Sequence, residues 1–400
     1  MKELRSVPQA VLERLVVGAA EVERTGSGLM PRRLPAWTSA QMVDDAPRVV
    51  ADQTAGVRLD FVTTASVVEL RANVTCHVWP ESDALSRKSV FALTSGEDLL
   101  DSVAVTGGTV VYLGSDGSPS GRASQGTPFT ITLRLPGAHA HRPRRAELWL
   151  PHNSAVDILG LRADAEILPY AGPRGPRWLH HGSSISHCQA AVGPLQVWPV
   201  VASRQLGLDL LDLGLAGHSL LDPFVARTIR DSSADVISVK LGINIVNGDA
   251  FTRRSFVPAL HGFLDTIRDG HPTTPLLVIS PVYCGIHEYA PGPTVFDPVT
   301  SAFVATTAPR DTAMGALTLG AVRQLVEDTV RRRALADSNL YLLDGRELLG
   351  EPDQHHLFDN VHPDSEGYEM MGNRFAALAR KPRSAVGAAF VPLSDFSVAG

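Results

Sequence analysis

The chain has 400 residues, 44% of them hydrophobic and 20% charged, which is typical of a globular protein with two domains. A formal net charge of -6 argues against nucleic acid or an anionic membrane as partner and favours a small molecule or a neutral polymer. No apolar run approaches the roughly 18 residues that a membrane helix needs.

Three cysteines, Cys76, Cys188 and Cys284, lie far apart in the sequence. Such spacing fits neither a disulfide framework nor a paired-thiol metal site, and indicates a reducing compartment. The apolar stretch at residues 15–20 ends at Glu21 and is too short for a signal peptide. We therefore expect a cytoplasmic protein, although export without a signal sequence stays open. The oligomeric state is not predicted.

Residues 2–24 have apolar side chains at helical spacing and predict an amphipathic helix or a cap on the following domain. From residue 57 the apolar period changes to two, at 57–61, 68–74 and 129–135, and strand-like segments follow at 146–150 and 156–162. Alternation of this kind predicts antiparallel strands with one buried and one wet face. Residues 106–109 predict a hairpin and 115–119 a loop. We interpret residues 1–168 as an all-β sandwich of the jelly-roll kind.

A Pro- and Gly-rich stretch at residues 168–177 predicts a linker. Beyond it, apolar runs at 208–213, 236–241, 276–282 and 340–343 alternate with helical stretches at 195–205, 223–230, 256–268 and 319–333. This alternation predicts an α/β domain with a central parallel sheet, at residues 177–380. Residues 285–315 predict a long loop, and 381–400 a tail that is weakly ordered or packs back on the β domain.

Polar and small residues follow the predicted parallel strands, where such sheets bind ligands. They are Gly182-Ser183-Ser184, the segment 214–219 with Gly217, Gly242-Ile243-Asn244, and Asp359-Asn360-Val361-His362. In order and spacing these blocks resemble those of the SGNH, or GDSL-like, hydrolase superfamily over about residues 177–380. The resemblance implies a flavodoxin-like α/β/α fold.

The resemblance also implies a role for each block. Ser184 becomes the nucleophile, with His362 and Asp359 completing a triad, and an oxyanion hole consists of the Ser184 and Gly217 N–H groups with the Asn244 amide. Those residue types fit the chemistry: a serine hydroxyl needs a base, an imidazole needs an orienting carboxylate, and an oxyanion needs fixed donors. Such a site requires no metal and no cofactor.

Two positions depart from the superfamily pattern, because its aspartates are replaced by Ser183 and Ile245. Further segments, at 33–37, 148–153, 178–187, 220–223 and 240–247, resemble a two-domain actinobacterial group of the same superfamily. That group includes the salicylyl acyltransferase of a tetracycline-type polyketide pathway, with a β-sandwich similar to carbohydrate-binding modules before the SGNH domain. The resemblance widens the expected reaction from hydrolysis to acyl transfer.

We expect a serine esterase that acts on a small-molecule or glycan O-acyl ester through an acyl-enzyme. The alternative is an O-acyltransferase that uses an acyl thioester, and a more remote one is a non-catalytic glycan-binding protein.

Several residues have a second interpretation. Gly217-His218-Ser219 resembles the start of a nucleophile elbow, but the expected second glycine is Leu221, so we interpret Ser219 as a turn or cap residue. Candidate pocket residues are His187, Cys284 and His287. The histidines at 180, 181, 187, 355 and 356 match no structural zinc spacing. Trp79 and Trp149 are interpreted as core, with sugar stacking as the alternative.

Overall fold

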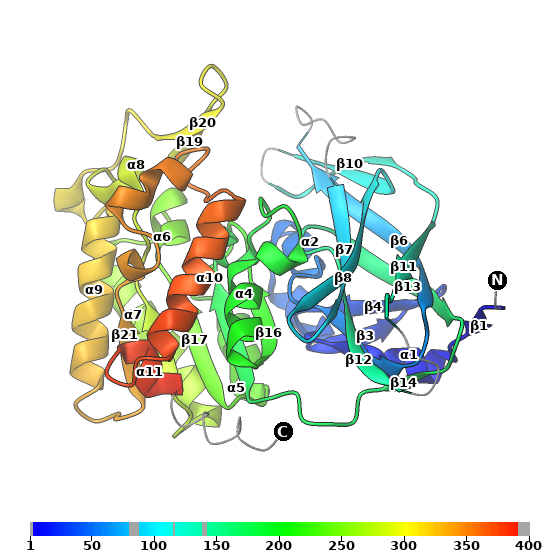
Figure 1. Cartoon of the computed structure of the whole chain (residues 1–400). Helices are drawn as coiled ribbons and strands as arrows, with labels where there is room; N and C mark the ends of the chain where they lie inside the picture. The colour runs from blue at the N-terminus through cyan, green and yellow to red at the C-terminus, as the bar shows by residue number, and fades with distance from the viewer. Residues whose placement is uncertain (1–2, 80–87, 115–116, 138–141, 391–400) are drawn as a thin grey trace. The chain divides into compact units, whose positions relative to one another are not determined.

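The computed structural model describes residues 3–79, 88–114, 117–137 and 142–390. These residues form two compact units, one from Met1–Pro173 with Val192–Leu195 and one from Arg174–Ala191 with Gln196–Gly400 (Figure 1). The boundary at residue 173 falls within the proposed linker, whereas the return of 192–195 to the first unit has no signal in the sequence. No helix in the described part of the chain is long and apolar enough to cross a membrane.

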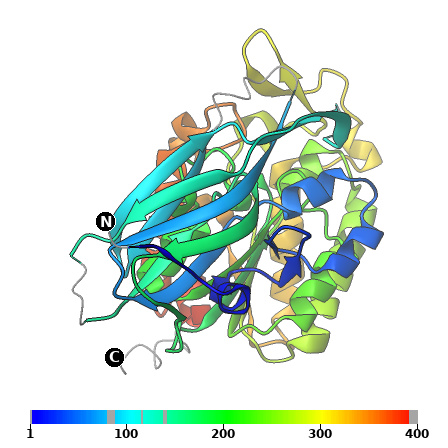
Figure 2. The ribbon, with the colours of Figure 1, turned by 90° about the vertical axis from the view of Figure 1, so that its right-hand side faces the viewer.

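The first unit is a β-sandwich, whose strands are visible in Figure 2. One sheet has the order β10-β9-β6-β13-β4-β3, with β1 on β13 and β11 on β6, and the other has the order β14-β5-β12-β7-β8, with β2 on β5. The strands are β1 (Arg5–Ser6), β2 (Val16–Val17), β3 (Glu21–Arg24), β4 (Leu29–Arg32), β5 (Arg58–Thr63), β6 (Val67–Val78), β7 (Lys88–Ser95), β8 (Asp98–Thr106), β9 (Thr109–Leu113), β10 (Pro119–Ser124), β11 (Phe129–Arg134), β12 (Arg144–Trp149), β13 (Ala155–Ala163) and β14 (Ile167–Pro169). The helices are α1 (Gln9–Leu15), η1 (Ala36–Gln41) and α2 (Ala46–Ala51).

The alternation in β6 is confirmed, because Val68, Leu70 and Ala72 are fully buried in the sandwich core. In β5 the expected wet face is wrong. Arg58 is 3% and Asp60 0% exposed, and they pair with Glu147 at 2.8 Å and Arg145 at 2.9 Å. Opposite charges on neighbouring strands allow both faces of β5 to be buried.

Two other expectations for the first unit are wrong. The N-terminal helix covers only Gln9–Leu15, because Val16 and Val17 pair with β5 and Gly18 follows at a φ of 78°. The expected hairpin at 106–109 is a crossover, since β8 pairs with β7 whereas β9 pairs with β6 and β10. A Gly-Gly turn specifies the local backbone but not the sheet that the next strand joins. Part of the expected loop at 115–119 lies outside the described residues.

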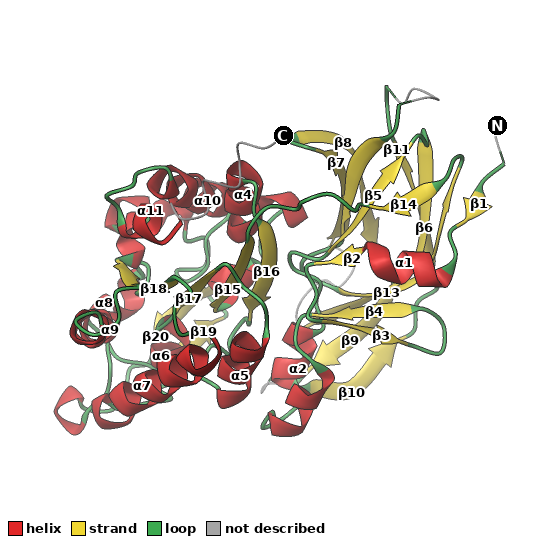
Figure 3. Cartoon of the chain, turned by 90° about the horizontal axis from the view of Figure 1, so that it is seen from below, coloured by secondary structure: helices red, strands yellow, loops and turns green. Residues whose placement is uncertain are grey.

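The second unit has a five-stranded parallel sheet of order β16-β15-β17-β18-β21, which confirms the α/β fold. In Figure 3, α4, α10 and α11 lie on one face of this sheet and α5 and α7 on the other, and α9 packs against α7 and β21. The strands are β15 (Arg177–Gly182), β16 (Asp209–Gly214), β17 (Val236–Lys240), β18 (Leu276–Ile279) and β21 (Leu340–Leu343). The helices are α3 (Ser184–His187), α4 (Trp198–Leu206), α5 (Pro223–Asp231), α6 (Ile243–Asn247), α7 (Arg253–Gly270), α8 (Gly285–Glu288), η3 (Thr312–Met314), α9 (Leu319–Arg333), η4 (Gly345–Glu347), η5 (Glu351–His356), α10 (Ser365–Ala379) and α11 (Ala385–Phe390). A further short helix, η2 (Pro194–Gln196), includes residues 194–195 of the first unit.

Two segments are more ordered than the sequence predicts. The expected loop at 285–315 contains α8 and an antiparallel hairpin of β19 (Thr294–Asp297) and β20 (Ala302–Ala305). In the expected tail, α11 packs within the second unit, with the Phe390 ring 5.7 Å from Trp178 and 5.4 Å from Phe375. Residues 391–400 of that tail lie outside the described residues.

Candidate active site

The turn after β15 presents Ser184 as the first residue of α3. Ser183 caps this helix, because its hydroxyl accepts a hydrogen bond from the Ile185 N–H at 3.3 Å. A Cβ at position 182 would lie 2.2 Å from the Ser186 hydroxyl oxygen, so only glycine fits there. Serine and aspartate are both good N-caps, which explains how Ser183 can replace the aspartate of the family pattern.

A hydrogen-bonded chain runs from Asp359 through His362 to Ser184. His362 Nδ1 lies 2.7 Å from an Asp359 carboxylate oxygen, and His362 Nε2 lies 2.9 Å from the Ser184 hydroxyl oxygen. A carboxylate accepts the proton of Nδ1, so Nε2 is left as an acceptor for the serine hydroxyl. Three residues separated by up to 178 positions in sequence therefore meet in the arrangement that a general base and its nucleophile require.

The loop that carries Asp359 and His362 is fixed by its own backbone. The second carboxylate oxygen of Asp359 accepts the N–H groups of Val361 at 3.0 Å and His362 at 2.6 Å. Asn360 between them has a φ of 70°, a left-handed conformation that asparagine tolerates. Burial disfavours the Asp359 carboxylate, but the hydrogen bonds from His362 and Val361 outweigh it, so the pKa of Asp359 lies below its usual value.

Three N–H donors that follow the neighbouring strands β15, β16 and β17 have no acceptor in the described part of the protein: the backbone N–H groups of Ser184 and Gly217 and the side-chain amide of Asn244. The amide of Asn244 is oriented by the Ser219 N–H, which donates to its carbonyl oxygen at 3.1 Å. This bond leaves the NH₂ group of Asn244 available. Donors that are fixed and unpaired are what an oxyanion site requires.

Glycine at position 217 is explained by its backbone conformation and not by lack of space. A Cβ there would meet nothing within 4 Å, whereas the φ of 78° is a conformation that other residues rarely adopt. At Gly242 both reasons apply, because φ is 124° and a Cβ would lie 2.4 Å from the Pro281 ring. Ile245, which replaces the second aspartate of the family pattern, is 1% exposed on α6 and serves the core.

The expected pocket residues His187, Cys284 and His287 are each 0% exposed, which argues against their lining a substrate pocket. Cys284 Sγ donates to the Asn360 carbonyl at 3.3 Å, and His287 Nε2 lies 2.7 Å from the Thr294 hydroxyl. Burial raises the pKa of the Cys284 thiol to about 12 and lowers the pKa of His287. Cys284 and His287 therefore support the loops around the site.

A second serine–histidine pair lies close by in the fold. The Ser219 hydroxyl oxygen is 3.2 Å from His181 Nε2, and His181 Nδ1 bonds the Leu213 carbonyl at 2.8 Å. Ser219 is 1% and His181 0% exposed, whereas Ser184 is 8% and the His362 side chain 25% exposed. A substrate can therefore reach Ser184 more easily than Ser219, which favours Ser184 as the nucleophile.

Other side chains with a second interpretation have ordinary structural contacts. The His356 ring bonds an Asp364 carboxylate oxygen at 3.0 Å and stacks on His355. Within the described ranges, no three His, Cys, Asp or Glu side chains are grouped to hold a metal ion. Trp149 is core, as expected, with its N–H on the Thr94 hydroxyl, but Trp79 is 45% exposed.

Two residues near the site were missed by the sequence interpretation. Lys240 is 3% exposed at the end of β17, its ammonium lies 3.5 Å from the Ser183 hydroxyl, and burial lowers its pKa to about 8. A lysine in the apolar run at 236–241 is a signal that could have identified it. Phe303 lies against the His362 ring, at 5.9 Å between centroids, and has no such signal.

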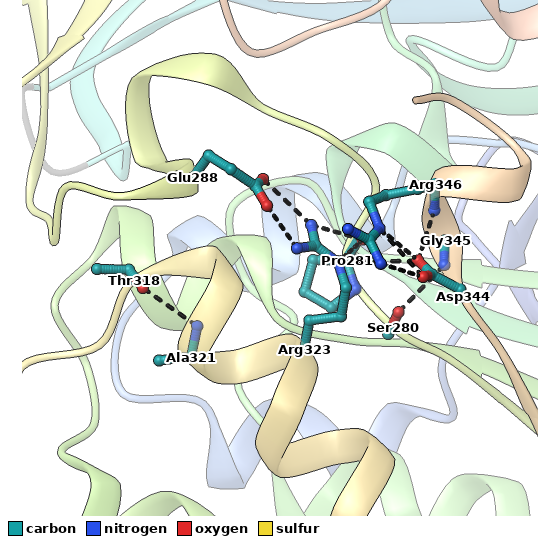
Figure 4. Close-up of polar contacts among 9 residues, drawn as sticks. All are labelled: Ser280, Pro281, Glu288, Thr318, Ala321, Arg323, Asp344, Gly345 and Arg346. Atoms are coloured by element: carbon teal, nitrogen blue, oxygen red, sulfur yellow. Dashed lines mark hydrogen bonds and ion pairs between the residues drawn. The ribbon is translucent and has the colours of Figure 1, made fainter. Parts of the chain in front are cut away.

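A buried ion pair ties α8 to α9 (Figure 4). Arg323 and Glu288 are each 6% exposed, with nitrogen and oxygen 2.5 Å apart, and Arg323 also donates to the Pro281 carbonyl. Nearby, the Gly345 N–H donates to the Ser280 hydroxyl at 3.1 Å. Because Cys284 directly precedes α8 and bonds the Asn360 carbonyl, this pair braces the segment that supports the His362 loop.

We expect Arg323→Met to lower the free energy of unfolding by about 3–5 kcal/mol, because it leaves the Glu288 carboxylate buried without its partner. Arg331→Met is the matched control on the same helix, since its pair with Glu327 is exposed and worth less than about 1 kcal/mol. Urea denaturation of both variants measures the difference. Equal losses in the two proteins would contradict the role assigned to the buried pair.

Comparisons with known proteins agree with the fold of the chain. Residues 177–286 match the family model of the GDSL-like lipase/acylhydrolase family, and no curated protein matches the chain. Among solved structures, a salicylyl-acyltransferase from a tetracycline biosynthetic pathway is 23% identical, with a TM-score of 0.78 over 98% of this chain and 99% of that one. A protein from Bacteroides ovatus classed as a GDSL-like lipase is 19% identical, with a TM-score of 0.66 over 94% and 98%.

A family two carbohydrate esterase from Clostridium thermocellum, in complex with cellohexaose, is 12% identical, with a TM-score of 0.58 over 91% of this chain and 98% of that one. At these identities the three structures establish a shared fold. They cover both units of the chain, and the family match includes the segments with Ser184, Gly217 and Asn244. Residues 177–286 of the second unit are therefore similar to the GDSL-like lipase/acylhydrolase family, and the chain shares its fold with the three structures.

Proposed function

We propose that the protein is a serine esterase that cleaves a small-molecule or glycan O-acyl ester through an acyl-enzyme. The observation that carries the proposal is the continuous chain of Asp359, His362 and Ser184, at 2.7 and 2.9 Å, together with three unpaired N–H donors that follow neighbouring strands of the same sheet. Ser184, His362 and Asp359 act as the catalytic triad, and Ser184, Gly217 and Asn244 form the oxyanion hole.

The reaction begins when the Ser184 oxygen attacks the ester carbonyl carbon while His362 Nε2 takes the hydroxyl proton. The carbonyl oxygen becomes an oxyanion and accepts hydrogen bonds from Ser184 N–H, Gly217 N–H and the Asn244 amide. His362 then protonates the leaving alcohol, and the carbon–oxygen bond breaks. Asp359 remains ionised throughout and stabilises the imidazolium.

Deacylation begins when His362 deprotonates an incoming water, whose oxygen attacks the acyl carbon. His362 then gives this proton to the Ser184 oxygen as the bond between that oxygen and the acyl carbon breaks. An alcohol in place of water gives transfer instead of hydrolysis. The fold shared with a salicylyl-acyltransferase over nearly the whole of both chains favours acyl transfer as the second candidate. The acyl donor of that reaction would be a thioester. Which reaction dominates depends on how well water is excluded and the acceptor is bound.

Product partition distinguishes the two reactions. The protein is incubated with a chromogenic acetyl ester and a set of added alcohols, and free acetate and acetylated alcohol are measured. Acetate alone across all acceptors supports the esterase, whereas transferred product supports the acyltransferase. No turnover with any ester or thioester would favour a glycan-binding protein without activity.

All three cysteines are free thiols, so we also propose a cytoplasmic location. Detection of the protein in the extracellular fraction would contradict this location.

We expect Asn244→Ala to lower kcat by about 100- to 1000-fold with little change in KM, because the amide stabilises the oxyanion and not the bound ester. Asn247→Ala, on the same helix but outside the oxyanion hole, is the matched control and should retain activity within about threefold. Steady-state kinetics on one ester measure both. An effect of Asn244→Ala on KM alone would remove it from the oxyanion hole.

A further inference from the structure

The hairpin of β19 and β20 is attached to the loop that carries His362. The Phe303 N–H donates to the Asp359 carbonyl at 2.9 Å, and the Asn360 side-chain amide donates to the Phe303 carbonyl at 3.0 Å. His287 holds the other strand through the Thr294 hydroxyl at 2.7 Å. A two-stranded hairpin is barely stable alone, so these bonds fix where its side chains lie.

Two phenylalanines extend from His362 along this hairpin. The Phe303 ring meets the His362 ring nearly edge-on, at 5.9 Å and 69°. Phe296, opposite Phe303 in the strand register, meets the Phe303 ring at 5.5 Å and 70° and is 53% exposed. The pair thus forms an apolar surface that begins at the imidazole and ends in solvent.

The position of this surface indicates which part of the substrate it contacts. His362 delivers its proton to the oxygen of the leaving alcohol, so atoms beside the imidazole face the alcohol portion of the ester. The acyl oxygen lies instead at the donors of Ser184, Gly217 and Asn244. A surface against His362 therefore belongs to the alcohol side, which is the side of the acceptor in acyl transfer.

The chemistry of the two side chains indicates the kind of alcohol. Phenyl rings carry no hydrogen-bonding group, so they offer no partner to the hydroxyls of a sugar and can contact only its C–H face. A planar ring would pack on them by stacking or edge contacts. We propose that Phe303 and Phe296 form a subsite for an aromatic or fused-ring alcohol. This inference rests on the proposed function and deepens it, because it names the alcohol class.

The test uses esters that share one acyl group: ethyl acetate, benzyl acetate and 2-naphthylmethyl acetate. Because each ester is compared between wild type and variant, its intrinsic reactivity cancels. We expect Phe303→Ala to lower kcat/KM for the naphthylmethyl ester by about 10- to 100-fold and for ethyl acetate by less than about threefold. Equal losses on all three esters would assign Phe303 to support of His362 and overturn the subsite.

Two further variants distinguish loss of the subsite from a folding defect of Phe303→Ala. Phe296→Ala removes an exposed ring and should show the same preference at about three- to tenfold. Val299→Ala, 90% exposed at the turn of the same hairpin, is the matched control and should change none of the ratios. If Phe303→Ala lowered kcat/KM more for ethyl benzoate than for benzyl acetate, the two rings would contact the acyl group and not the alcohol, which would overturn the proposal. Equal losses on an acetylated sugar would overturn the aromatic class.

Failure of the proposed function has a different signature. If the wild type cleaves no ester and a fluorophosphonate does not label Ser184, the proposed esterase function is wrong. Binding of 2-naphthylmethanol to the Ser184→Ala protein, measured by saturation-transfer NMR, tests the subsite without turnover. We expect Phe303→Ala in that background to weaken binding at least about fivefold. The subsite would be overturned if Phe303→Ala left this binding unchanged, or if the Ser184→Ala protein did not bind 2-naphthylmethanol.

Discussion

Replacement of Ser184 by alanine is expected to lower kcat for an acetyl ester by about 10⁴- to 10⁶-fold. The variant keeps the Ser184 N–H and the rest of the oxyanion hole but has no atom to attack the carbonyl carbon. Only the modest acceleration from oxyanion binding should remain. Because Ser184 is 8% exposed and its hydroxyl bonds one partner, His362, the fold should tolerate the change. Steady-state kinetics and the urea midpoint of the same preparation measure both effects.

Ser219→Ala is the natural comparison, because it removes the other serine hydroxyl that bonds a histidine. It keeps the backbone N–H that orients Asn244, so activity should fall by less than about tenfold. A fluorophosphonate probe, located by mass spectrometry, should label Ser184 in the wild type and in Ser219→Ala, and nothing in Ser184→Ala. A label on Ser219, or full activity in Ser184→Ala, would invalidate the whole site assignment.

The parallel sheet was predictable because its inner strands are buried on both faces. The short apolar run at 236–241 fits such a strand, and the structure has the fully buried strand β17 at Val236–Lys240. The run at 340–343 forms β21 at the edge of the sheet, where Tyr341 and Leu342 are only partly buried. Once strand order follows the βαβ rule, the residues after each strand must meet at one edge of the sheet. Ser184 and Asn244, which follow β15 and β17, could therefore be placed at one edge from the sequence, whereas His362, beyond η5, was assigned to the site by the resemblance to the superfamily.

The errors arose where the fold depends on contacts distant in sequence. The local sequence predicts that Arg58 and Asp60 are exposed to solvent. In the structure they are buried, because they form ion pairs with Glu147 and Arg145 on a neighbouring strand. Phe303 lies in a Pro- and Thr-rich stretch whose local pattern predicts a loop, and its position is set by Asp359 and Asn360 more than 50 residues away. No local periodicity encodes pairing of that kind.

The two departures from the family pattern, Ser183 and Ile245, change side chains that support the site and not those proposed to react. Ser183 caps α3 as an aspartate could, but it brings no charge, and the Lys240 ammonium lies 3.5 Å from its hydroxyl. Ile245 replaces a polar side chain with core packing. Neither change touches the Ser184–His362 bond or the three unpaired donors. The chemistry can therefore be retained while the surroundings of the nucleophile turn differ from the family pattern.

Asp359→Asn is expected to lower kcat by about 10⁴-fold near neutral pH while the fold is retained. The carbonyl oxygen of an asparagine can still accept the N–H groups of Val361 and His362, which leaves its NH₂ group toward His362 Nδ1. A donor there requires Nδ1 to be the acceptor, so the proton moves to Nε2. An N–H then points at the Ser184 hydroxyl, and the general base is lost.

The charge of Asp359 also has a consequence for stability. Its pKa is below the usual value, so the carboxylate stabilises the fold above the unfolded pKa, and this contribution is lost as pH falls through the folded pKa. Wild type should therefore lose more stability than Asp359→Asn on acidification below about pH 4, where unfolded aspartates protonate. Urea midpoints of the two proteins at pH 7 and in this acidic range test the difference. Parallel pH dependence would contradict it.

Asp364→Asn supplies the matched control for the kinetic prediction. Asp364 also bonds a histidine, with His356 Nδ1 at 3.0 Å, and it caps α10 through the Gly367 N–H. Asparagine caps a helix as well as aspartate does, so this variant should keep activity within about threefold. The two variants make the same chemical change at two aspartate–histidine pairs, only one of which includes Ser184. A similar loss in both, or retention of more than about a tenth of the activity in Asp359→Asn, would show that the His362 tautomer does not control the reaction.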